Sequence, residues 1–408
     1  MRMKKVFDFK TFISLALDSE TLPNELFIGS LDDFLTPLKN LTGGKVKVFM
    51  PEKDFKKVGA PLFDKIKSFK SDATLTIVSV SDLTYSAIKQ AIDSKTDISI
   101  AVGDKYLLSA VRYYSSLSKI PCVAIVTSPS FDKVFSDNVY LKRNGEVEIC
   151  PAKKFEKVLV DESLILKSRS ENFAEAYACS VKKLTSLIDY KMGCFLSGAS
   201  VDEGVFSLVK KAVNVCLSAP SYENGKSAII ASQTLLSIVI GKAPAIINSG
   251  AETLVFALSK CAPESKDCKK EIISFEKVLK LYHAFFSNDF SSLLSTPEYF
   301  LDIEKLQKEF NISKEFLLGN LKIPSEKRRL LINLLIDKTR DDFLSETTAI
   351  LKAFYKIKKY YSSLTGVMGD GNISYKQIKN AVTLSPYLTD KTSVLTLMRD
   401  LGVLSCAN

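Results

Sequence analysis

The stretch that decides the fold is residues 97–136, "DISIAVGDKYLLSAVRYYSSLSKIPCVAIVTSPSFDKVFS". Two short runs rich in β-branched and small apolar residues, 97–102 and 122–126, flank a segment with apolar residues at helical spacing. A continuous apolar run is typical of a strand buried on both faces, as strands of parallel sheets are. Strand, helix and strand in this order predict a βαβ unit and a parallel sheet.

The same alternation extends on both sides of this unit. Further β-branched runs lie at 45–50 and 73–80, and helical patterns follow them at 54–69 and 86–93. A hairpin is expected at 138–150 because Asn144-Gly145 is a favoured two-residue turn, and a last short strand ends at Asp161. We therefore expect an α/β, Rossmann-like N-terminal domain over residues 1–163.

After residue 165 the strand patterns stop and long amphipathic stretches take over. Apolar residues recur there at helical spacing as far as residues 390–404, which predicts a mostly α-helical domain over residues 164–408. Where a nucleotide-binding half meets a helical half, we expect a ligand site in the cleft between them.

Composition limits the possible functions. The 408 residues, 46% hydrophobic and 25% charged, can form two domains with large cores. His283 is the single histidine, which excludes any site that needs two imidazoles. The formal charge of +10 comes from basic residues dispersed along the chain, so we do not expect a nucleic-acid partner.

The cysteines and the apolar segments indicate a cytoplasmic protein. None of the eight cysteines forms a CxxC pair, and most lie beside apolar residues, so we expect reduced core thiols. The N-terminus has no continuous apolar signal region. The apolar run from Ala228 to Ile247 is broken by Ser, Gln, Lys and Pro, which favours a buried helix over a membrane span.

A small polar cluster follows that apolar run, in "INSGAETLVFA" (247–257). Two interpretations are open: an ordinary helix start, or the floor of an active site. Ser249 is a candidate N-cap and Glu252, at the third helical position, would complete a capping box. This local chemistry alone accounts for the cluster without catalysis.

Four segments, taken in order, resemble the glycerol-1-phosphate dehydrogenase family. They are "IAVGDKYLLSAVRY", "IPCVAIVTSPSFDKVFS", "INSGAETLVFA" and "SPYLTDKTSVLTLMRDLGVL". The similarity covers about residues 24–405, with extra helical sequence at about 285–345. The family shares a superfamily with iron-containing alcohol dehydrogenases and dehydroquinate synthase.

The resemblance implies a Rossmann-like domain, a helical domain, NAD or NADP as cofactor and usually a divalent metal. The implied reaction belongs to phospholipid metabolism and interconverts dihydroxyacetone phosphate and glycerol 1-phosphate. A small phosphorylated metabolite is then the expected partner, and a homo-oligomer stays open.

On the dinucleotide side, the family's three-glycine loop corresponds to Gly103, Asp104 and Lys105. One glycine remains, Asp104 brings a carboxylate near the place of the pyrophosphate, and Lys105 offsets that charge. The resemblance also implies cofactor contacts for Thr127, Ser130 and Ser136 and a place beside the substrate for Asp132. A turn rich in Ser, Pro and Asp at a strand end is the alternative interpretation.

On the metal side, the family uses one Asp and two His. The resemblance aligns Cys179, Thr253 and Ser274 with these ligand positions, a poor donor set for zinc, iron, nickel or magnesium. We therefore expect no divalent metal. Glu175 lies one helical turn before Cys179 on the same face and is the alternative metal ligand. Glu175 and Ser249 are also the candidate substrate contacts on this side.

His283 is nine residues beyond Ser274 and is interpreted as a partly buried helix histidine.

The sequence leaves two functional hypotheses. One is a divergent NAD(P)-dependent oxidoreductase, with Lys105, Lys277 and Tyr282 as acids by residue type alone. The other is a catalytically inactive relative that binds a nucleotide or phosphorylated ligand, or acts as a protein-interaction scaffold.

Overall fold

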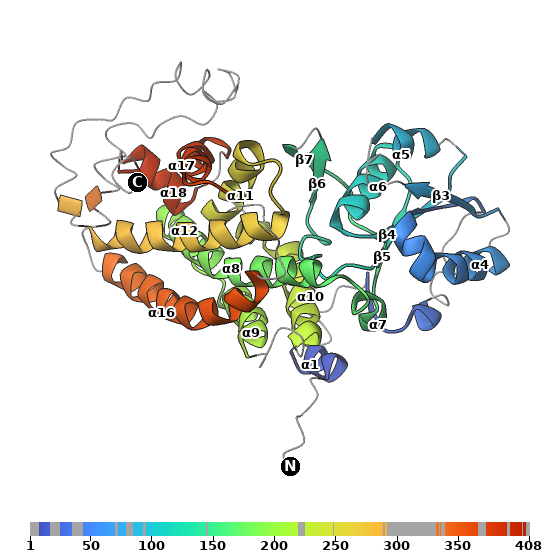
Figure 1. Cartoon of the computed structure of the whole chain (residues 1–408), viewed down its shortest axis with the longest axis horizontal. Coiled ribbons are helices and arrows are strands. Elements are labelled where there is room, and N and C mark those ends of the chain that lie inside the picture. The colour runs from blue at the N-terminus through green and yellow to red at the C-terminus, as the bar shows by residue number, and fades with distance from the viewer. Residues whose placement is uncertain are drawn as a thin grey trace, which may run out of the picture. The chain divides into compact units, whose positions relative to one another are not determined.

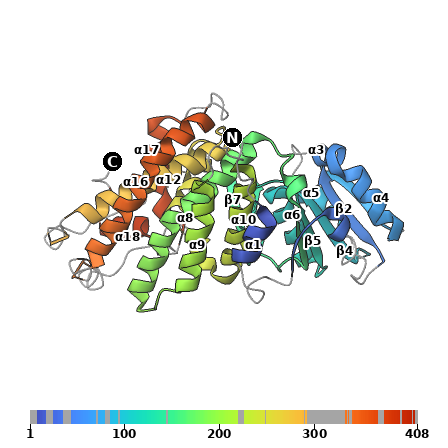
Figure 2. The same cartoon turned by 90° about the horizontal axis from the view of Figure 1, so that it is seen from below.

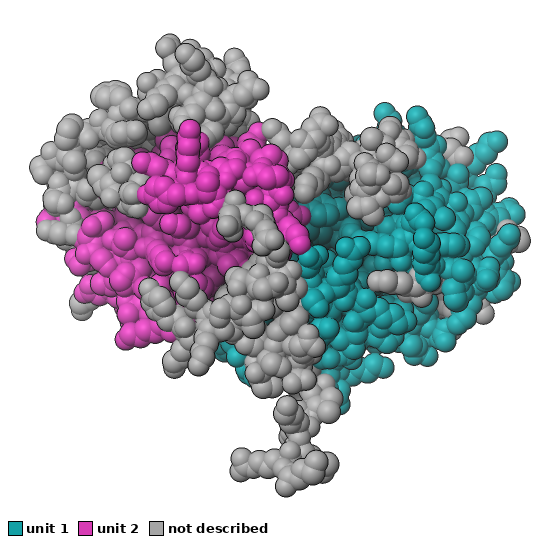
Figure 3. All heavy atoms as spheres, in the orientation of Figure 1, with its two compact units in different colours: residues 1–180, 208–244 teal, residues 181–207, 245–408 magenta. Residues whose placement is uncertain are grey.

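The structure is a computed structural model of the chain (Figure 1). It describes residues 8–16, 25–34, 44–69, 72–78, 85–92, 95–143, 146–218, 225–247, 249–288, 290–291, 332–333, 335, 339–365, 373–389, 392–401 and 403–404. The chain divides into two compact units, coloured separately in Figure 3. The sheet unit comprises residues 1–180 and 208–244, and the helical unit comprises residues 181–207 and 245–408. The domain division after residue 163 suggested by the sequence remains a proposal.

The sheet unit contains a six-stranded, all-parallel sheet, which confirms the α/β prediction. The strand order is β1-β8-β5-β4-β2-β3. The strands are β1 (Leu26–Ile28), β2 (Val46–Pro51), β3 (Thr74–Val78), β4 (Ile98–Gly103), β5 (Cys122–Val126) and β8 (Lys157–Val160). The sequence did not predict β1, which has three half-buried residues and thus too little pattern to detect.

The predicted βαβ unit is formed by β4, helix α6 (Lys105–Leu117) and β5. Every residue of β4 and β5 is buried, as their continuous apolar composition requires. The strands pair in register from Ser99 with Cys122 to Gly103 with Val126, and α6 packs on both. The carboxyl end of β4 therefore leads directly into the start of α6.

Other elements of the sheet unit follow the predicted spacing with one difference. The helix expected at 54–69 is α3 (Glu52–Asp54), a π-helical segment η1 (Phe55–Gly59) and α4 (Ala60–Phe69). The hairpin forms from β6 (Asn138–Arg143) and β7 (Glu146–Pro151), but its Asn144-Gly145 turn lies outside the described residues. Helices α1 (Phe9–Ala16), α5 (Tyr85–Ala91) and α7 (Glu162–Ile165) also belong to this unit.

Three longer helices follow the sheet along the chain: α8 (Ser170–Ser197), α9 (Glu203–Leu217) and α10 (Lys226–Lys242) (Figure 2). Helix α10 is buried at every residue from Ala228 to Ile240, which explains its apolar composition. Among the described residues, no helix combines the length and apolar character needed to cross a membrane.

The helical unit confirms the prediction of a helical C-terminal region. Besides the part of α8 from residue 181 on, its helices include α11 (Gly250–Cys261), α12 (Asp267–Ser287), α16 (Thr339–Thr365), α17 (Tyr375–Leu384) and α18 (Val394–Asp400), with short 3-10 turns η3 (Pro244–Ile247) and η5 (Ser385–Tyr387). Helix α12 contacts α11, α16 and α18 (Figure 1). Its aromatic residues Phe285 and Phe286 pack with Phe290 and Phe343 in the buried hydrophobic cluster of this unit. Most of the insertion expected at 285–345 lies outside the described residues.

Candidate functional site

The turn between β4 and α6 is closed by its own acidic residue. Asp104 is the N-cap of α6, and its Oδ1 accepts hydrogen bonds from the N–H groups of Tyr106 (3.2 Å) and Leu107 (3.3 Å). These donors are the backbone groups that a bound anion would use at a helix N-terminus. A Cβ on Gly103 would lie 2.8 Å from the Leu107 side chain, so this position is closely packed. The carboxylate thus stands where the resemblance implies a phosphate.

Two lysine–carboxylate pairs surround this turn. Lys53 Nζ is 2.9 Å from Asp104 Oδ2, and Lys105 pairs with Glu175 of α8. The Ser130 hydroxyl donates to the same Glu175 carboxylate at 3.3 Å. The Lys53 and Lys105 side chains are 34% and 31% exposed, so solvent reaches both. Two ammonium groups and two carboxylates make the surface of the turn nearly neutral.

The loop after β5, which holds the remaining sequence-predicted cofactor residues, is fixed from two sides. The Thr127 N–H donates to the Gly103 carbonyl at 3.1 Å, which joins this loop to the β4–α6 turn. The Gln233 amide oxygen accepts from the N–H groups of Phe131 (3.1 Å) and Asp132 (3.0 Å). The Gln233 amide nitrogen donates to the Ala176 carbonyl of α8 at 2.9 Å. A glutamine inside an apolar helix therefore anchors the loop to α8 and α10.

The second anchor of this loop is Arg112 of α6, which is 2% exposed. Its guanidinium donates to the carbonyls of Val134 (2.9 Å), Ser136 (2.7 Å) and Asn138 (2.9 Å). Burial lowers the pKa of Arg112 to about 10, so the group stays charged near neutral pH. The Ser136 hydroxyl, also fully buried, accepts from the Asn138 N–H at 3.1 Å. These contacts attach the loop to α6.

Asp132, the expected substrate contact, is 5% exposed. Burial, with a smaller contribution from the Asp132 charge, raises the pKa of the Tyr140 phenol. The sheet unit therefore brings together Gly103, Asp104, Lys105, Thr127, Ser130 and Glu175, while Asp132 and Ser136 lie within the same anchored loop. Their functional roles remain predictions.

In the helical unit, the polar cluster before α11 is a helix start. Ser249 is the N-cap, as predicted, and its hydroxyl accepts from the Glu252 N–H at 3.2 Å, but the structure assigns this helix start no capping box. The Glu252 carboxylate forms an ion pair with Lys182 of α8, a use that the sequence did not indicate. The cluster thus begins α11 and also supplies a buried charge.

A second buried carboxylate explains why this helix start is so closely packed. Asp189 of α8 accepts hydrogen bonds from the Gly250 N–H, the Val394 N–H and the Tyr282 hydroxyl, each at 2.8 Å. Burial raises the pKa of Asp189 to about 7, partly offset by these three donors. One side chain thereby connects α8, α11, α12 and α18. Tyr282, considered above as an acid by type, is committed to this contact.

Thr253 and Ser274 occupy the two positions aligned with the family's histidines, and both hydroxyls donate hydrogen bonds to backbone carbonyls of α11. Thr253 donates to the Gly250 carbonyl at 2.9 Å, and Ser274 donates to the Ala251 carbonyl at 2.9 Å. A neutral hydroxyl is a weak ligand for zinc or iron, so these residues do not fit the implied metal. Over the part of the chain that the structure describes, no group of three His, Cys, Asp or Glu side chains is arranged to hold an ion.

Two further residues, Cys179 and His283, were considered in connection with a metal. Cys179 is a buried free thiol of α8, in the part of that helix assigned to the sheet unit. His283 on α12 is half-buried, which confirms its interpretation as a helix histidine. Four residues that organise the two regions were missed: Arg112, Lys182, Asp189 and Gln233. Their one sequence signal is a polar side chain on the apolar face of a helix.

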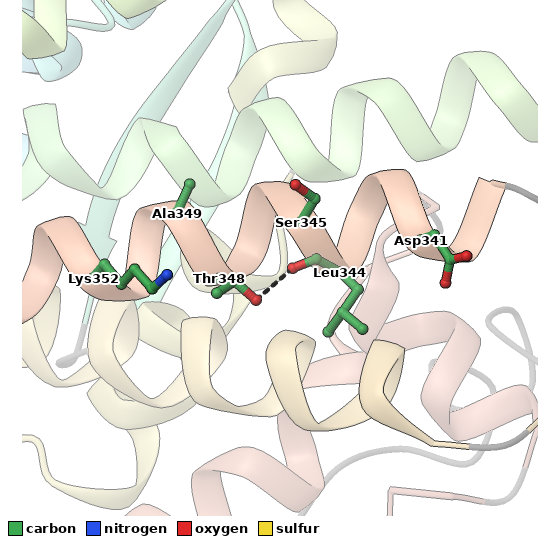
Figure 4. A pocket seen from close by; sticks show the side chains of 6 residues that line it. All are labelled: Asp341, Leu344, Ser345, Thr348, Ala349 and Lys352. Carbon is green, nitrogen blue, oxygen red and sulfur yellow. Dashed lines mark hydrogen bonds between the residues drawn. The ribbon is translucent and has the colours of Figure 1, made fainter.

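A surface hollow elsewhere in the helical unit is lined, among the described residues, by one helix. It has a volume of about 410 Å³ and is lined by residues of α16 (Figure 4). The Thr348 hydroxyl in this hollow donates to the Leu344 carbonyl one turn earlier, at 2.7 Å. None of the sequence-predicted site residues lines it.

Comparisons with known proteins agree with this fold. No family model matches the chain. A stretch of 181 residues is 24% identical to the glycerol-1-phosphate dehydrogenase [NAD(P)+] of Geobacillus thermodenitrificans, covering 42% of this chain. The match spans 45% of that relative, about half its length.

Solved structures show the same architecture over nearly the whole chain. An iron-containing alcohol dehydrogenase from Thermotoga maritima superposes with a TM-score of 0.55 at 14% identity, covering 94% of this chain and 98% of its own. A glycerol dehydrogenase from Schizosaccharomyces pombe gives 0.54 at 12% identity, covering 90% and 96%. The fold is therefore that of these dehydrogenases, and the resemblance stated from the sequence is confirmed at this level.

Proposed function

We propose that this chain is a catalytically inactive relative of glycerol-1-phosphate dehydrogenases that binds a small phosphorylated metabolite at its β4–α6 turn. We infer the loss of metal-assisted chemistry from the side chains at the positions aligned with the family's metal ligands. At the positions aligned with the family's histidines, Thr253 and Ser274 use their hydroxyl hydrogens on backbone carbonyls of α11. Side chains used in this way supply neither the charge nor the geometry that a catalytic metal needs.

The binding part of the proposal rests on the cations at the turn. Lys53 and Lys105 flank the N-terminus of α6, and both are partly exposed. A phosphate dianion would compete with the Asp104 carboxylate for the same backbone N–H groups and for Lys53. With Asp104 and Lys105 in place of glycines, the extended pyrophosphate of a dinucleotide fits this turn less well than a single phosphate does.

Asp104→Ser tests this proposal because serine keeps an N-cap while it removes the competing charge. We expect dihydroxyacetone phosphate or glycerol 1-phosphate to raise the melting temperature of the wild type, and to bind Asp104→Ser about tenfold more tightly, equal to about 1.4 kcal/mol. Thermal-shift and calorimetric titrations measure both effects. Equal affinities in the two proteins would contradict a site at this turn.

The second candidate is an active NAD(P)-dependent oxidoreductase on the same substrate pair, favoured by the sequence match to glycerol-1-phosphate dehydrogenase. It is tested by following NADH or NADPH consumption with dihydroxyacetone phosphate, with and without added zinc, nickel or magnesium. The proposal above expects no turnover under any of these conditions. Turnover that depends on a metal would replace it with this candidate.

A further inference from the structure

Three charged side chains meet in the interior of the helical unit. Lys182 comes from α8, Glu252 from α11 and Glu271 from α12. Lys182 Nζ lies 2.5 Å from Glu252 Oε2 and donates to the Glu271 carboxylate. The three side chains are 1%, 3% and 6% exposed. We call these three residues the ion cluster.

Burying two carboxylates requires a positive charge beside them. An isolated buried carboxylate is strongly disfavoured, whereas a carboxylate that is paired and hydrogen-bonded can stay ionised. One ammonium group attracts both carboxylates and donates a hydrogen bond to Glu271. Because the three side chains come from three helices, the cluster also fixes the packing of α8, α11 and α12 together.

The position of the ion cluster in the sequence is informative. Lys182 comes three residues after Cys179, Glu252 comes immediately before Thr253, and Glu271 comes three residues before Ser274. Cys179, Thr253 and Ser274 are the positions that the resemblance aligns with the metal ligands. The same three helices therefore lack suitable metal ligands at the aligned positions and carry a buried cation with two carboxylates within one turn of them.

We propose that the Lys182 ammonium group replaces a divalent cation in the helical unit, holding Glu252 and Glu271 as an ion would. Lys182 is part of the chain, so the helical unit keeps its charge balance at any metal concentration. The inference deepens the proposed function in one respect, the absence of a catalytic metal. It concerns the helical unit, whereas the proposed ligand binds the sheet unit, so the two can fail separately.

Lys182→Ala tests the proposal because it removes the ammonium group and leaves space beside two carboxylates. We expect the melting temperature of this variant to fall by several degrees in the presence of a chelator. Adding Mn²⁺, Mg²⁺ or Zn²⁺ should restore most of the loss, because carboxylate oxygens bind these ions. The same ions should leave the wild-type melting temperature unchanged.

Two matched variants separate a cation site from unspecific stabilisation. Lys183→Ala removes the neighbouring lysine of α8, which is equally buried, and its stability should not respond to the ions. Lys182→Ala/Glu271→Gln removes one of the two carboxylates and should lose the metal response of Lys182→Ala. The proposal is overturned if none of the three ions stabilises Lys182→Ala, or if they stabilise Lys183→Ala equally.

If Lys182→Ala does not fold, Lys182→Met keeps the volume and permits a charge test. Lys182→Met alone leaves two buried carboxylates without the ammonium group, so its melting temperature should fall more than that of Lys182→Met/Glu271→Gln. Additive losses in this double-mutant cycle would show that the lysine does not act on the carboxylate, and would overturn the proposal.

Discussion

At the scale of single residues, Asp189 joins four helices through one buried carboxylate. Its carboxylate accepts hydrogen bonds from the first N–H of α11, the first N–H of α18 and the Tyr282 hydroxyl. Its carboxyl has a pKa near 7 because burial outweighs these three donors. The folded protein therefore binds a proton at Asp189 more tightly than the unfolded chain, whose value is near 3.8.

This pKa shift predicts the pH dependence of stability. Because the folded pKa is the higher one, the contribution of Asp189 is most favourable below the unfolded value and is lost as pH rises from 3.8 to about 7. Asp189→Asn removes this titration and places an NH₂ group opposite backbone donors, which should cost about 1–3 kcal/mol. Urea unfolding should show that the difference between wild type and variant shrinks from pH 4.5 to pH 8, by roughly 1.4 kcal/mol per pKa unit at most. For the exposed control Asp342→Asn, the free energy of unfolding should change with pH in parallel with that of the wild type. The same parallel behaviour for Asp189→Asn would contradict the raised pKa of Asp189.

Gly250 offers a second test at this scale. A Cβ there would collide with the Tyr282 hydroxyl and lie 2.9 Å from Leu395 Cγ. Since Tyr282 is held by Asp189, it cannot move away freely, and Gly250→Ala should cost about 1–3 kcal/mol. Gly193→Ala in α8 is the matched control because nothing lies within 4 Å of its Cβ position. This control should be neutral or stabilise by up to about 1 kcal/mol.

At the scale of elements, the loop after β5 is held by two side chains from outside it, Arg112 and Gln233. Arg112→Met removes the donors of three backbone carbonyls and should lower the free energy of unfolding by about 3 kcal/mol or more. Arg112→Lys should give an intermediate loss, because an ammonium group lacks the planar fork of the guanidinium. Denaturant unfolding and amide exchange at Val134–Asn138 measure the two effects. Equal stability of wild type and Arg112→Met would show that the three contacts contribute nothing.

The elements predicted best were those with repeated local patterns. The strands at 97–102 and 122–126 and the helix between them were evident because their apolar spacing is continuous. The short edge strand β1 and the π-helical segment Phe55–Gly59 were missed. The conformation of β1 is set by a neighbour distant in sequence, since β1 pairs with β8. Local periodicity carries no information about such partners.

As with the strands and helices, the sequence predicted those features of the candidate sites that depend on residues close together in the chain. Ser249 was identified as a helix cap because capping is local chemistry between residues three apart. Lys182 and Asp189 were not identified because their partners lie 61 or more residues away in the chain. A buried charge looks like any other polar residue of a helix until its partner is known.

At the scale of the whole molecule, the cysteines report on folding. Those described are free thiols, as the sequence predicted, and burial raises the pKa of Cys122 and of Cys216 to about 11. Alkylation requires a thiolate and access, so these two should react only when their unit unfolds. Cys194 and Cys261, which are half-buried, should be modified first. Mass spectrometry after iodoacetamide treatment tests the order, and early labelling of Cys216 in native buffer would contradict it.

The hydrogen bond from Val394 to Asp189 joins residues 205 positions apart. During synthesis, α8 leaves the ribosome long before residue 394 has been translated. The helical unit therefore cannot complete the hydrogen bonds of Asp189 until residue 394 has been made. Premature termination shortly before α18 would remove a short helix and also one of the donors to the buried Asp189 carboxylate, so such truncated products should be prone to proteolysis.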